Sequence, residues 1–278
     1  MNILITGTEG FIGKNLSLYL KSRGHKIKGY EYKENILPDP QSCDWVIHCG
    51  AVSSTTESNV ERVLKLNYEF TINLIKLCDR KGVNFQYASS ASIYGPSKNF
   101  KENAAKFPQT PYAWSKYLVD RFLVKEGLHE KKFNILIQGF RYFNVYGPHE
   151  EHKGDQASPI TKFTIQAKKT GVIKLFEGSE NFKRDFICVS DVCRIHEQML
   201  ILKVSGIFNV GTGQSTSFKE IAEIIAQKYN ATIEYIPMPE SIKKHYQAYT
   251  CADLANLNKH VAIDYQTVEK YINTKKIK

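Results

Sequence analysis

Tyr112 and Lys116 are a pair of side chains whose types and spacing suit a chemical step. They stand four residues apart in PYAWSK, where Pro111 suits a first helical position and Thr110 the cap before it. Their Cβ atoms would then lie about 6 Å apart on one helix face. A phenol, whose pKa is about 10, is a poor base at neutral pH unless a nearby cation favours the phenolate. The alternative is an ordinary solvated helix face, so the pair needs support from other motifs.

A glycine-rich turn near the start of the chain gives that support. TGTEGFIG places Gly7, Gly10 and Gly13 between an apolar strand and a helix. Glycines there let the backbone approach a pyrophosphate, which the helix N-terminus then binds. The spacing differs from the usual G-x-G-x-x-G, but Glu31 at the end of the next strand supplies the context that the motif requires. The turn therefore predicts a dinucleotide cofactor, with a plain strand-to-helix turn as the alternative.

A third motif, YASSASIYG, ends a strand in hydroxyl groups. Ligands of open α/β sheets bind at the carboxyl edge of the strands. Ser90 is therefore a candidate to hydrogen-bond a substrate oxygen while Tyr112 removes its proton. Serines at a strand end are often only turn formers, and it is the other two motifs that favour the catalytic interpretation.

The elements that would position these residues alternate between strand and helix patterns. This alternation predicts a parallel α/β sheet with crossover helices. After residue 150 it loosens, with helices expected near 160–170, 190–203 and 217–229, and the end NTKKIK is expected to fray. In the first part we expect strands at 2–6, 26–32, 44–51, 85–90 and 134–140, and helices at 11–24, 60–82 and from Pro111.

Composition limits the classes of partner. The 278 residues are 42% hydrophobic and 24% charged, as in a soluble globular chain of one large or two intimate domains. The net charge of +10 is spread over most segments, so we expect no nucleic-acid partner. The chain begins without a signal-peptide pattern, and no apolar run approaches a membrane span, so we expect a cytoplasmic protein with no membrane partner. The six cysteines lack metal-ligand spacing, so we expect reduced thiols and no metal.

Six segments together resemble the extended short-chain dehydrogenase/reductase family, the group of nucleotide-sugar epimerases and dehydratases. Within it the chain is most similar to the enzymes that invert C6 of an ADP-heptose. The resemblance implies a Rossmann-like doubly wound parallel sheet, with a dinucleotide-binding domain at 1–149 plus about 183–211. A smaller mixed α/β substrate-binding domain would span 150–182 plus 212–278. The six segments are HCGAVSSTTE, YASSASIYG, FRYFNVYGPHEEHKG, LFEGSENFKRDF, GIFNVGTG and IEYIPMPESIKKHYQAYTCADL.

The resemblance implies a tightly bound nicotinamide cofactor, NADP in the first instance with NAD as the alternative. The cofactor takes hydride from C6 and returns it to the other face of a transient ketone. Tyr112, Lys116 and Ser90 are the catalytic set that the resemblance implies, with Lys116 also on the nicotinamide ribose. The implied cofactor positions are Gly7, Gly10, Phe11, Ile12, Gly13, Glu31, Tyr32, Lys33, Cys49, Gly50, Ala51, Val52, Ser53, Asn67, Lys116 and Val145.

Lys153, in the HKG loop, corresponds to the second acid/base of these epimerases. Inversion requires proton transfer on two sides, because the hydroxyl oxygen differs in place between the epimers while the hydride donor stays fixed. A lysine, whose pKa is about 10.4 in water, can approach neutrality when partly desolvated beside other cations. The alternative for Lys153 is a solvated surface charge.

The second half carries the implied substrate positions. Arg184 suits a diphosphate, which a planar guanidinium can bind bidentately. Its alternative is a salt bridge at the rim with Asp185 or Glu180. Asp155 and Lys162 depart from the Ser and His that are usual after the lysine loop, so sugar or base contacts are expected to differ. The implied positions are Ser90, Asn144, Asp155, Lys162, Phe176, Glu177, Gly178, Ser179, Arg184 and Tyr246.

The segment between Glu31 and Asp44 is too short for a strand with its crossover helix. We therefore expect a sheet one strand short of the family's usual sheet and a reduced adenine pocket. Glu31 could accept from a ribose 2′-hydroxyl, which favours NAD, whereas Lys33 could neutralise a 2′-phosphate, which favours NADP.

Two other functions stay open at this point. One is another enzyme of the same group on a nucleotide sugar, such as a 4-epimerase or a reductase; SSASIYG lacks the paired acidic residue of the 4,6-dehydratases. The other is a dinucleotide-sensing module without catalysis, which the intact Ser90, Tyr112 and Lys116 set disfavours. The resemblance also implies a homo-oligomer that binds a small nucleotide sugar.

Overall fold

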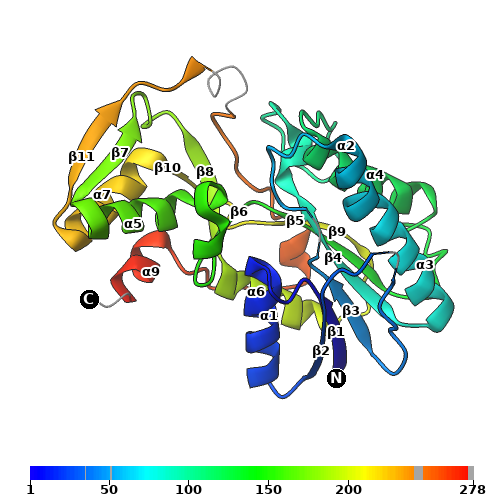
Figure 1. Ribbon diagram of the computed structural model, residues 1–278. Helices are drawn as coiled ribbons and strands as arrows, with labels where there is room; N and C mark the ends of the chain where they lie inside the picture. The colour runs from blue at the N-terminus through cyan, green and yellow to red at the C-terminus, as the bar shows by residue number, and fades with distance from the viewer. Residues whose placement is uncertain (35, 51, 241–246, 275–278) are drawn as a thin grey trace.

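The larger part of the molecule is built on a six-stranded parallel sheet (Figure 1). The structure is a computed structural model that describes residues 1–34, 36–50, 52–240 and 247–274. The strands lie in the order β2, β1, β3, β4, β5, β9, and each pair is parallel. The predicted parallel α/β sheet is therefore confirmed. Its strands are β1 (Asn2–Thr6), β2 (Lys26–Tyr30), β3 (Trp45–His48), β4 (Asn84–Ser90), β5 (Ile137–Tyr142) and β9 (Gly206–Val210).

Helices cover both faces of this sheet. Alternate side chains of a strand point to opposite faces, so Ile3 and Ile5 of β1 pack under one helical layer and Leu4 under the other. The first layer is α1 (Phe11–Ser22) with α6 (Val189–Leu200). The second holds α2 (Val60–Val63), α3 (Phe70–Lys81) and α4 (Pro111–Lys125), on the other side of the sheet in Figure 1. The sheet is thus doubly wound and Rossmann-like, as predicted.

The sheet ends at β2. Strand β1 pairs with β2 on one side and with β3 on the other, and no described strand lies beyond β2. Between β2 and β3 the described residues form one isolated bridge, which joins Lys33 and Ile36. The segment between β2 and β3 therefore adds no strand of its own to the sheet, as the short distance between Glu31 and Asp44 predicts.

The long helix before Gly82 is not a regular α-helix throughout. Its middle, η1 (Leu64–Glu69), is a π-helical segment between α2 and α3. The apolar spacing predicted a single α-helix over 60–82, and this interpretation is wrong at η1. Such segments insert an extra residue into a turn and occur often at functional sites. Here the segment contains Asn67, which is fully buried.

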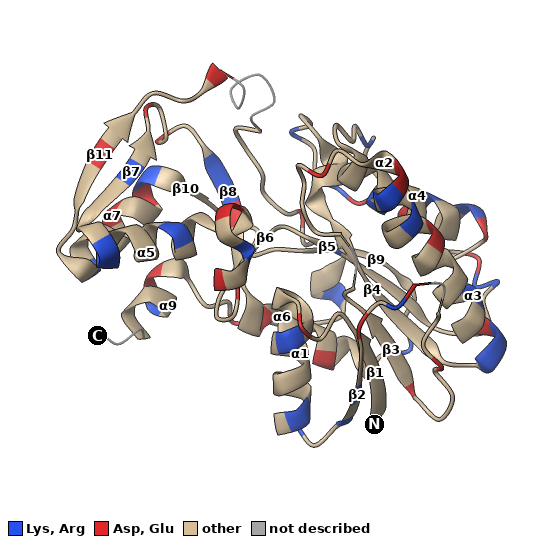
Figure 2. Ribbon diagram, in the orientation of Figure 1, with Lys and Arg blue, Asp and Glu red and all other residues tan. Residues whose placement is uncertain are grey.

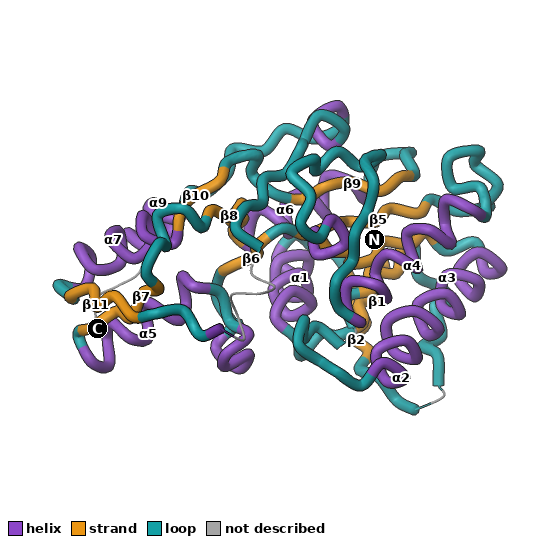
Figure 3. The backbone as a smooth tube through the Cα atoms, turned by 90° about the horizontal axis from the view of Figure 1, so that it is seen from above, coloured by secondary structure: helices purple, strands orange, loops and turns teal. Residues whose placement is uncertain are grey.

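The smaller part holds short strands that periodicity did not predict. It lies beside the large sheet when seen from above (Figure 3). Helices α5 and α7 pack together against the pair of strands β7 and β11. Strands β6, β8 and β10 form a separate sheet. The bounds are β6 (Asn144–Tyr146), α5 (Pro159–Thr170), β7 (Val172–Phe176), β8 (Lys183–Cys188), β10 (Ser215–Ser217), α7 (Phe218–Tyr229), β11 (Thr232–Ile236) and α9 (Val268–Thr274).

The predicted domain ranges stay a prediction, and some residues of each range pack in the core of the other part. Phe186 and Cys188 of β8, which the prediction placed in the dinucleotide-binding domain, pack in the core of the smaller part. Ala252, Leu254 and Leu257, which it placed in the substrate-binding domain, pack against the large sheet. At the C-terminus, α9 includes the first two residues of the segment expected to fray, and 275–278 lie outside the described residues.

Charge is dispersed over the surface of both parts. Figure 2 shows Lys and Arg on most of the labelled helices, interspersed with Asp and Glu. In the described ranges, no helix combines the length and apolarity that crossing a bilayer requires. All six cysteines are free; Cys78, Cys188 and Cys193 are buried and the other three are half-buried.

Asp185 of β8 joins the two parts through buried hydrogen bonds. Its Oδ1 accepts from the backbone N–H (2.7 Å) and the hydroxyl (2.8 Å) of Thr212. Its Oδ2 accepts from the N–H groups of Gly213 and Ala252, each at 2.9 Å. Burial raises the pKa of Asp185, and these hydrogen bonds oppose the rise. One carboxylate thus satisfies donors from two segments that lie far apart in the sequence.

Replacing Asp185 by Ala should therefore lower the free energy of unfolding by about 3 kcal/mol, because buried donors lose their acceptor. Urea denaturation measures this change. Asp264→Ala, at an exposed position, is the control and should change stability by less than about 0.5 kcal/mol. An equal, small effect of both substitutions would contradict the role given to Asp185.

Candidate active site

The glycine turn lies where β1 ends and α1 begins. Gly7 has φ +74°, and a Cβ there would come within 2.7 Å of the backbone of Gly50. A Cβ on Gly13 would overlap the carbonyl oxygen of Gly7. A side chain at Gly7 would therefore push the turn away from the end of β3, and one at Gly13 would push the turn away from α1. The glycines thus allow the first N–H groups of α1, which have no partner within the helix, to face a ligand.

A cavity of about 380 Å³ opens above this turn. Its wall combines the carboxyl ends of β1, β2 and β3 with the start of α1, which is where dinucleotides bind in such sheets. A backbone cradle with no side chains in the way fits a pyrophosphate. The predicted residues that line the cavity are Gly7, Gly10, Phe11, Ile12, Gly13, Glu31, Tyr32, Cys49, Gly50, Val52, Ser53 and Lys153.

Four predicted cofactor residues do not line this cavity: Lys33, Asn67, Lys116 and Val145. Lys33 is exposed, and its backbone N–H donates to the Tyr30 hydroxyl (3.3 Å). Val145, in β6, packs against the core beside β5. Ala51, also predicted, lies outside the described residues.

Asn67 positions the cavity wall instead of lining it. Its Oδ1 accepts from Val52 N–H (2.8 Å), and its Nδ2 donates to Val52 O (3.0 Å) and to the Ser115 hydroxyl (3.0 Å). One buried amide therefore connects the π-helical segment, the loop after β3 and α4. The cofactor contact predicted for Asn67 stays a prediction, and the structure connects Asn67 to the cavity through Val52.

Glu31 turns back onto the glycine turn from the end of β2. Its Oε1 accepts from the Thr8 hydroxyl and from the Glu9 N–H, both at 2.8 Å. These hydrogen bonds hold the Glu31 carboxylate at the cavity wall, and its other oxygen, Oε2, is a second acceptor.

Tyr112, Lys116 and Ser90 come together, and Lys116 interacts with Cys49, which lines this cavity. Thr110 caps α4 by accepting from Ala113 N–H (3.2 Å). One turn later, Lys116 Nζ lies 5.9 Å from the centre of the Tyr112 ring. Burial raises the pKa of Tyr112, and a hydrogen bond with Ser90 opposes that rise. Burial lowers the pKa of Lys116 to about 8, and electrostatic interactions with Cys49 and Asp120 oppose this fall. The phenol is therefore neutral near pH 7, and Lys116 is a cation close to losing its proton.

Lys153 reaches the cavity from the other part of the molecule. It lies in η3 (Glu151–Gln156), where Gly154 has non-helical angles, and its Nζ is 5.5 Å from the centre of the Phe11 ring. Burial lowers its pKa, and the charge of Glu150 opposes the fall. Lys153 is thus a desolvated amine at the cavity wall, unlike a freely solvated lysine.

Glu150, which sequence reasoning missed, holds the Lys153 loop. It is fully buried and accepts from Ser158 N–H (2.9 Å), from the Ser158 hydroxyl (2.6 Å), from the Thr161 hydroxyl (2.6 Å) and from Gly147 N–H (3.3 Å). No local spacing rule connects a Glu to a helix cap eight residues later, so this role left no recognisable signal.

Other cavity residues were also missed. Arg62, Leu66 and Phe70 repeat at four-residue intervals, which places them on one helix face, and this spacing could have been found. Thr6, Tyr30 and His48 end or nearly end their strands at the predicted edge. His152 neighbours the predicted lysine.

The predicted substrate residues of the second half surround β7 and β8. Ser179 is buried, and its hydroxyl has no hydrogen-bond partner among the described residues. Arg184 is 8% exposed, with its guanidinium 5.7 Å from the centre of the Phe218 ring. Asn144 Oδ1 accepts from the Thr250 hydroxyl (3.4 Å). Phe176 ends β7, with Glu177 and Gly178 in the turn that follows. Tyr246 lies outside the described residues.

Asp155 and Lys162, the two departures, contact each other. Lys162 Nζ donates to the backbone oxygen of Asp155 (3.4 Å). Asp155 is exposed and Lys162 is half-buried. This hydrogen bond joins the Lys153 loop, which contains Asp155, to α5, which contains Lys162. Neither residue lines the cavity above the glycine turn.

Comparisons with known proteins agree with this geometry. Residues 3–211 match the NAD dependent epimerase/dehydratase family. The chain is 39% identical to an ADP-L-glycero-D-manno-heptose-6-epimerase of Brachyspira hyodysenteriae, over 92% of this chain and 90% of that protein.

Solved structures with the same fold include the ADP-L-glycero-D-manno-heptose-6-epimerase of Helicobacter pylori. It aligns with a TM-score of 0.84 at 27% identity, covering 98% of this chain and 94% of that one. A UDP-N-acetylglucosamine 4-epimerase from Methanobrevibacter ruminantium M1 aligns with a TM-score of 0.82 over 98% and 97% of the two chains, and at 22% identity it shares the fold alone. From the family match and the similarity to the Brachyspira protein along nearly its whole length, the chain belongs to the NAD dependent epimerase/dehydratase family.

Proposed function

We propose that this protein is a nucleotide-sugar epimerase that inverts C6 of an ADP-heptose. One observation carries the proposal: two side chains that could each transfer a proton, Tyr112 and Lys153, come from separate elements, α4 and η3. Lys153 lines the cavity above the glycine turn, and Lys116, next to Tyr112, interacts with Cys49 of the cavity wall. The similarity to the Brachyspira enzyme supports the choice of sugar.

Gly7, Gly10 and Gly13 would hold a nicotinamide dinucleotide in the cavity, and this group would supply reversible hydride transfer at C6 of the sugar. Ser90 would hold the reacting oxygen, and its hydrogen bond with Tyr112 supports this role. Tyr112 would take the proton of the C6 hydroxyl as the C–H electron pair leaves as hydride. Lys116 favours the phenolate by its charge, and the positive nicotinamide adds to that effect.

The second proton transfer needs a group on the other side of the ketone. The ketone must present its opposite face to the fixed hydride, which moves its oxygen away from Tyr112. Lys153 comes from a different part of the chain, and burial lowers its pKa, so it gives up a proton more readily than a solvated lysine does. It would protonate or deprotonate the oxygen in the second orientation.

The diphosphate would lie toward the second half. Arg184 is nearly buried and can bind phosphoryl oxygens with its planar fork. The Ser179 hydroxyl is a second candidate contact, since it is buried without a partner among the described residues.

For the cofactor, the resemblance implies NADP, but the contacts of Glu31 favour NAD. Its carboxylate lines the cavity, where it can accept from a ribose 2′-hydroxyl and would repel a 2′-phosphate. Lys33, which would neutralise such a phosphate, does not line the cavity.

The proposed reaction can be tested by incubating the purified protein with ADP-D-glycero-D-manno-heptose and following C6 configuration by NMR. We expect approach to an epimer mixture without net consumption of cofactor. Tyr112→Phe is the control, and it should retain bound dinucleotide while losing turnover by a factor of at least about 100. If the wild-type protein binds dinucleotide but leaves the sugar unchanged, the choice of substrate is wrong.

Lys153→Met should slow epimerisation by at least about 100-fold, because one of two proton transfers loses its group. Cofactor binding should be retained, since the glycine turn is untouched, and fluorescence titration with NADH measures it. Lys169→Met, at an exposed position in the last turn of α5, is the matched lysine control and should turn over normally. Normal turnover by Lys153→Met would show that a single acid/base suffices.

Glu31→Gln should raise the affinity for NADP relative to NAD by about tenfold, because it removes a charge that repels the 2′-phosphate. Calorimetric titration of both cofactors measures this ratio. Lys33→Gln should leave the ratio unchanged. Tighter binding of NADP than of NAD by the wild-type protein would contradict the role of Glu31.

A further inference from the structure

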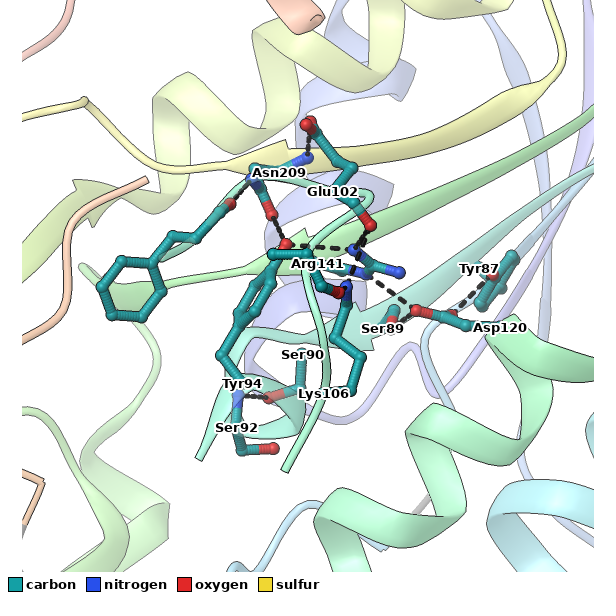
Figure 4. A network of polar contacts seen from close by, with 12 residues as sticks. Tyr87, Ser89, Ser90, Ser92, Tyr94, Glu102, Lys106, Asp120, Arg141 and Asn209 are labelled. Carbon is teal, nitrogen blue, oxygen red and sulfur yellow. Dashed lines mark hydrogen bonds and ion pairs between the residues drawn. The ribbon is translucent and has the colours of Figure 1, made fainter. Parts of the chain in front are cut away.

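Asp120 is a buried carboxylate behind the proposed catalytic residues. It is 2% exposed and lies one turn after Lys116 on α4. Its Oδ1 accepts from the Tyr87 hydroxyl (2.8 Å), and its Oδ2 accepts from the Ser89 hydroxyl (3.1 Å) and from Arg141 Nε (2.8 Å). Figure 4 shows these groups converging on Asp120 from β4 and β5. Three donors on two strands thus bind one side chain of the catalytic helix.

The same network reaches Ser90 from both sides along the chain. Ser89, bound to Asp120, precedes it. After it, η2 (Ala91–Tyr94) begins, and the Tyr94 hydroxyl accepts from Arg141 Nη1 (3.0 Å) and donates to Asn209 (2.7 Å). The Asp120–Arg141 ion pair therefore fixes the backbone before and after Ser90 (Figure 4).

Asp120 also differs in charge from the other groups that face Lys116. On β3, burial lowers the pKa of His48 to about 3, so this ring is neutral. Burial raises the pKa of Cys49 to about 12, so its thiol keeps its proton. Tyr112, on α4, is a neutral phenol near pH 7. The Asp120 carboxylate, which forms an ion pair with Arg141, also acts on Lys116.

We propose that Asp120 is a positioning residue for catalysis: it holds Ser90 beside Tyr112 and supplies the negative charge that faces the Lys116 ammonium. This inference rests on the proposed function of the same site. Side chains four apart on a helix lie on one face, so the carboxylate and the ammonium interact across one turn. Arg141, on β5, holds the Asp120 carboxylate against the sheet through their ion pair.

The charge part of the proposal gives a defined change with pH. Lys116 must be protonated to stabilise the Tyr112 phenolate, so activity falls as pH rises through the pKa of Lys116, which is about 8. Removing the Asp120 charge disfavours the ammonium and lowers that pKa. The alkaline limb of the activity profile should then move to lower pH.

Asp120→Asn tests this in the cofactor-bound protein. The pKa of Lys116, measured by NMR of lysine labelled with ¹³C at Cε and assigned with Lys116→Arg, should fall by about 1 pH unit. The alkaline limb of kcat should move by the same amount. Tyr87→Phe, which removes a hydrogen bond to Asp120 but no charge, is the matched control and should leave both unchanged.

An Asp120→Asn protein with an unchanged Lys116 pKa would overturn the proposal, even if its activity were lower. Because the substitution leaves Arg141 without its counter-ion, circular dichroism must show that the fold is retained. If it is not, Asp120→Asn combined with Arg141→Gln removes both charges and should still lower the Lys116 pKa. The NMR titration needs no turnover, so it stays valid if the proposed sugar proves wrong.

Discussion

The pairing of β1 with two parallel neighbours is the constraint on which the rest of the site depends. Parallel strands bring their carboxyl ends to one edge. Gly7, Glu31 and Cys49, which follow β1, β2 and β3, therefore meet at one cavity although they are far apart in the sequence. The close approach of Gly7 to Gly50 is the local cost of this pairing, and only residues without a side chain allow it. Strand β4 extends the same edge and places Ser90 next to the helix that carries Tyr112.

Sequence reasoning was effective where function depends on local spacing. The glycine turn, the cap at Thr110 and the Tyr112–Lys116 interval are each set by a few consecutive residues, and the structure forms each of them. The absence of a further strand between β2 and β3 was predicted from the short segment between Glu31 and Asp44, compared with the usual sheet of the family. In the second half, the helices expected near 160–170, 190–203 and 217–229 are confirmed as α5, α6 and α7. The short strands there were missed, because strands of three residues such as β6 and β10 are too short to show alternation.

The contacts that hold the site together left no such signal. Asp120, Glu150 and Asp185 are buried acids whose partners lie on other elements, so their roles depend on tertiary structure. Each carboxylate gathers three or four donors, which offsets the cost of burying its charge. The π-helical turn that contains Asn67 is similar, since the apolar pattern fits a regular helix and the hydrogen bonds of the buried amide are made to other segments.

The early end of the sheet has a consequence for self-association. With no described strand beyond it, β2 presents an unpaired backbone edge, and such edges can pair with another molecule and aggregate. Two features of β2 oppose this. Lys26 and Lys28 are exposed on the strand, and the Lys28 ammonium donates to Asp39 O (3.2 Å), in the segment that leads to β3. The lysine charges and the segment that leads to β3 thus oppose the pairing of the β2 edge with another molecule.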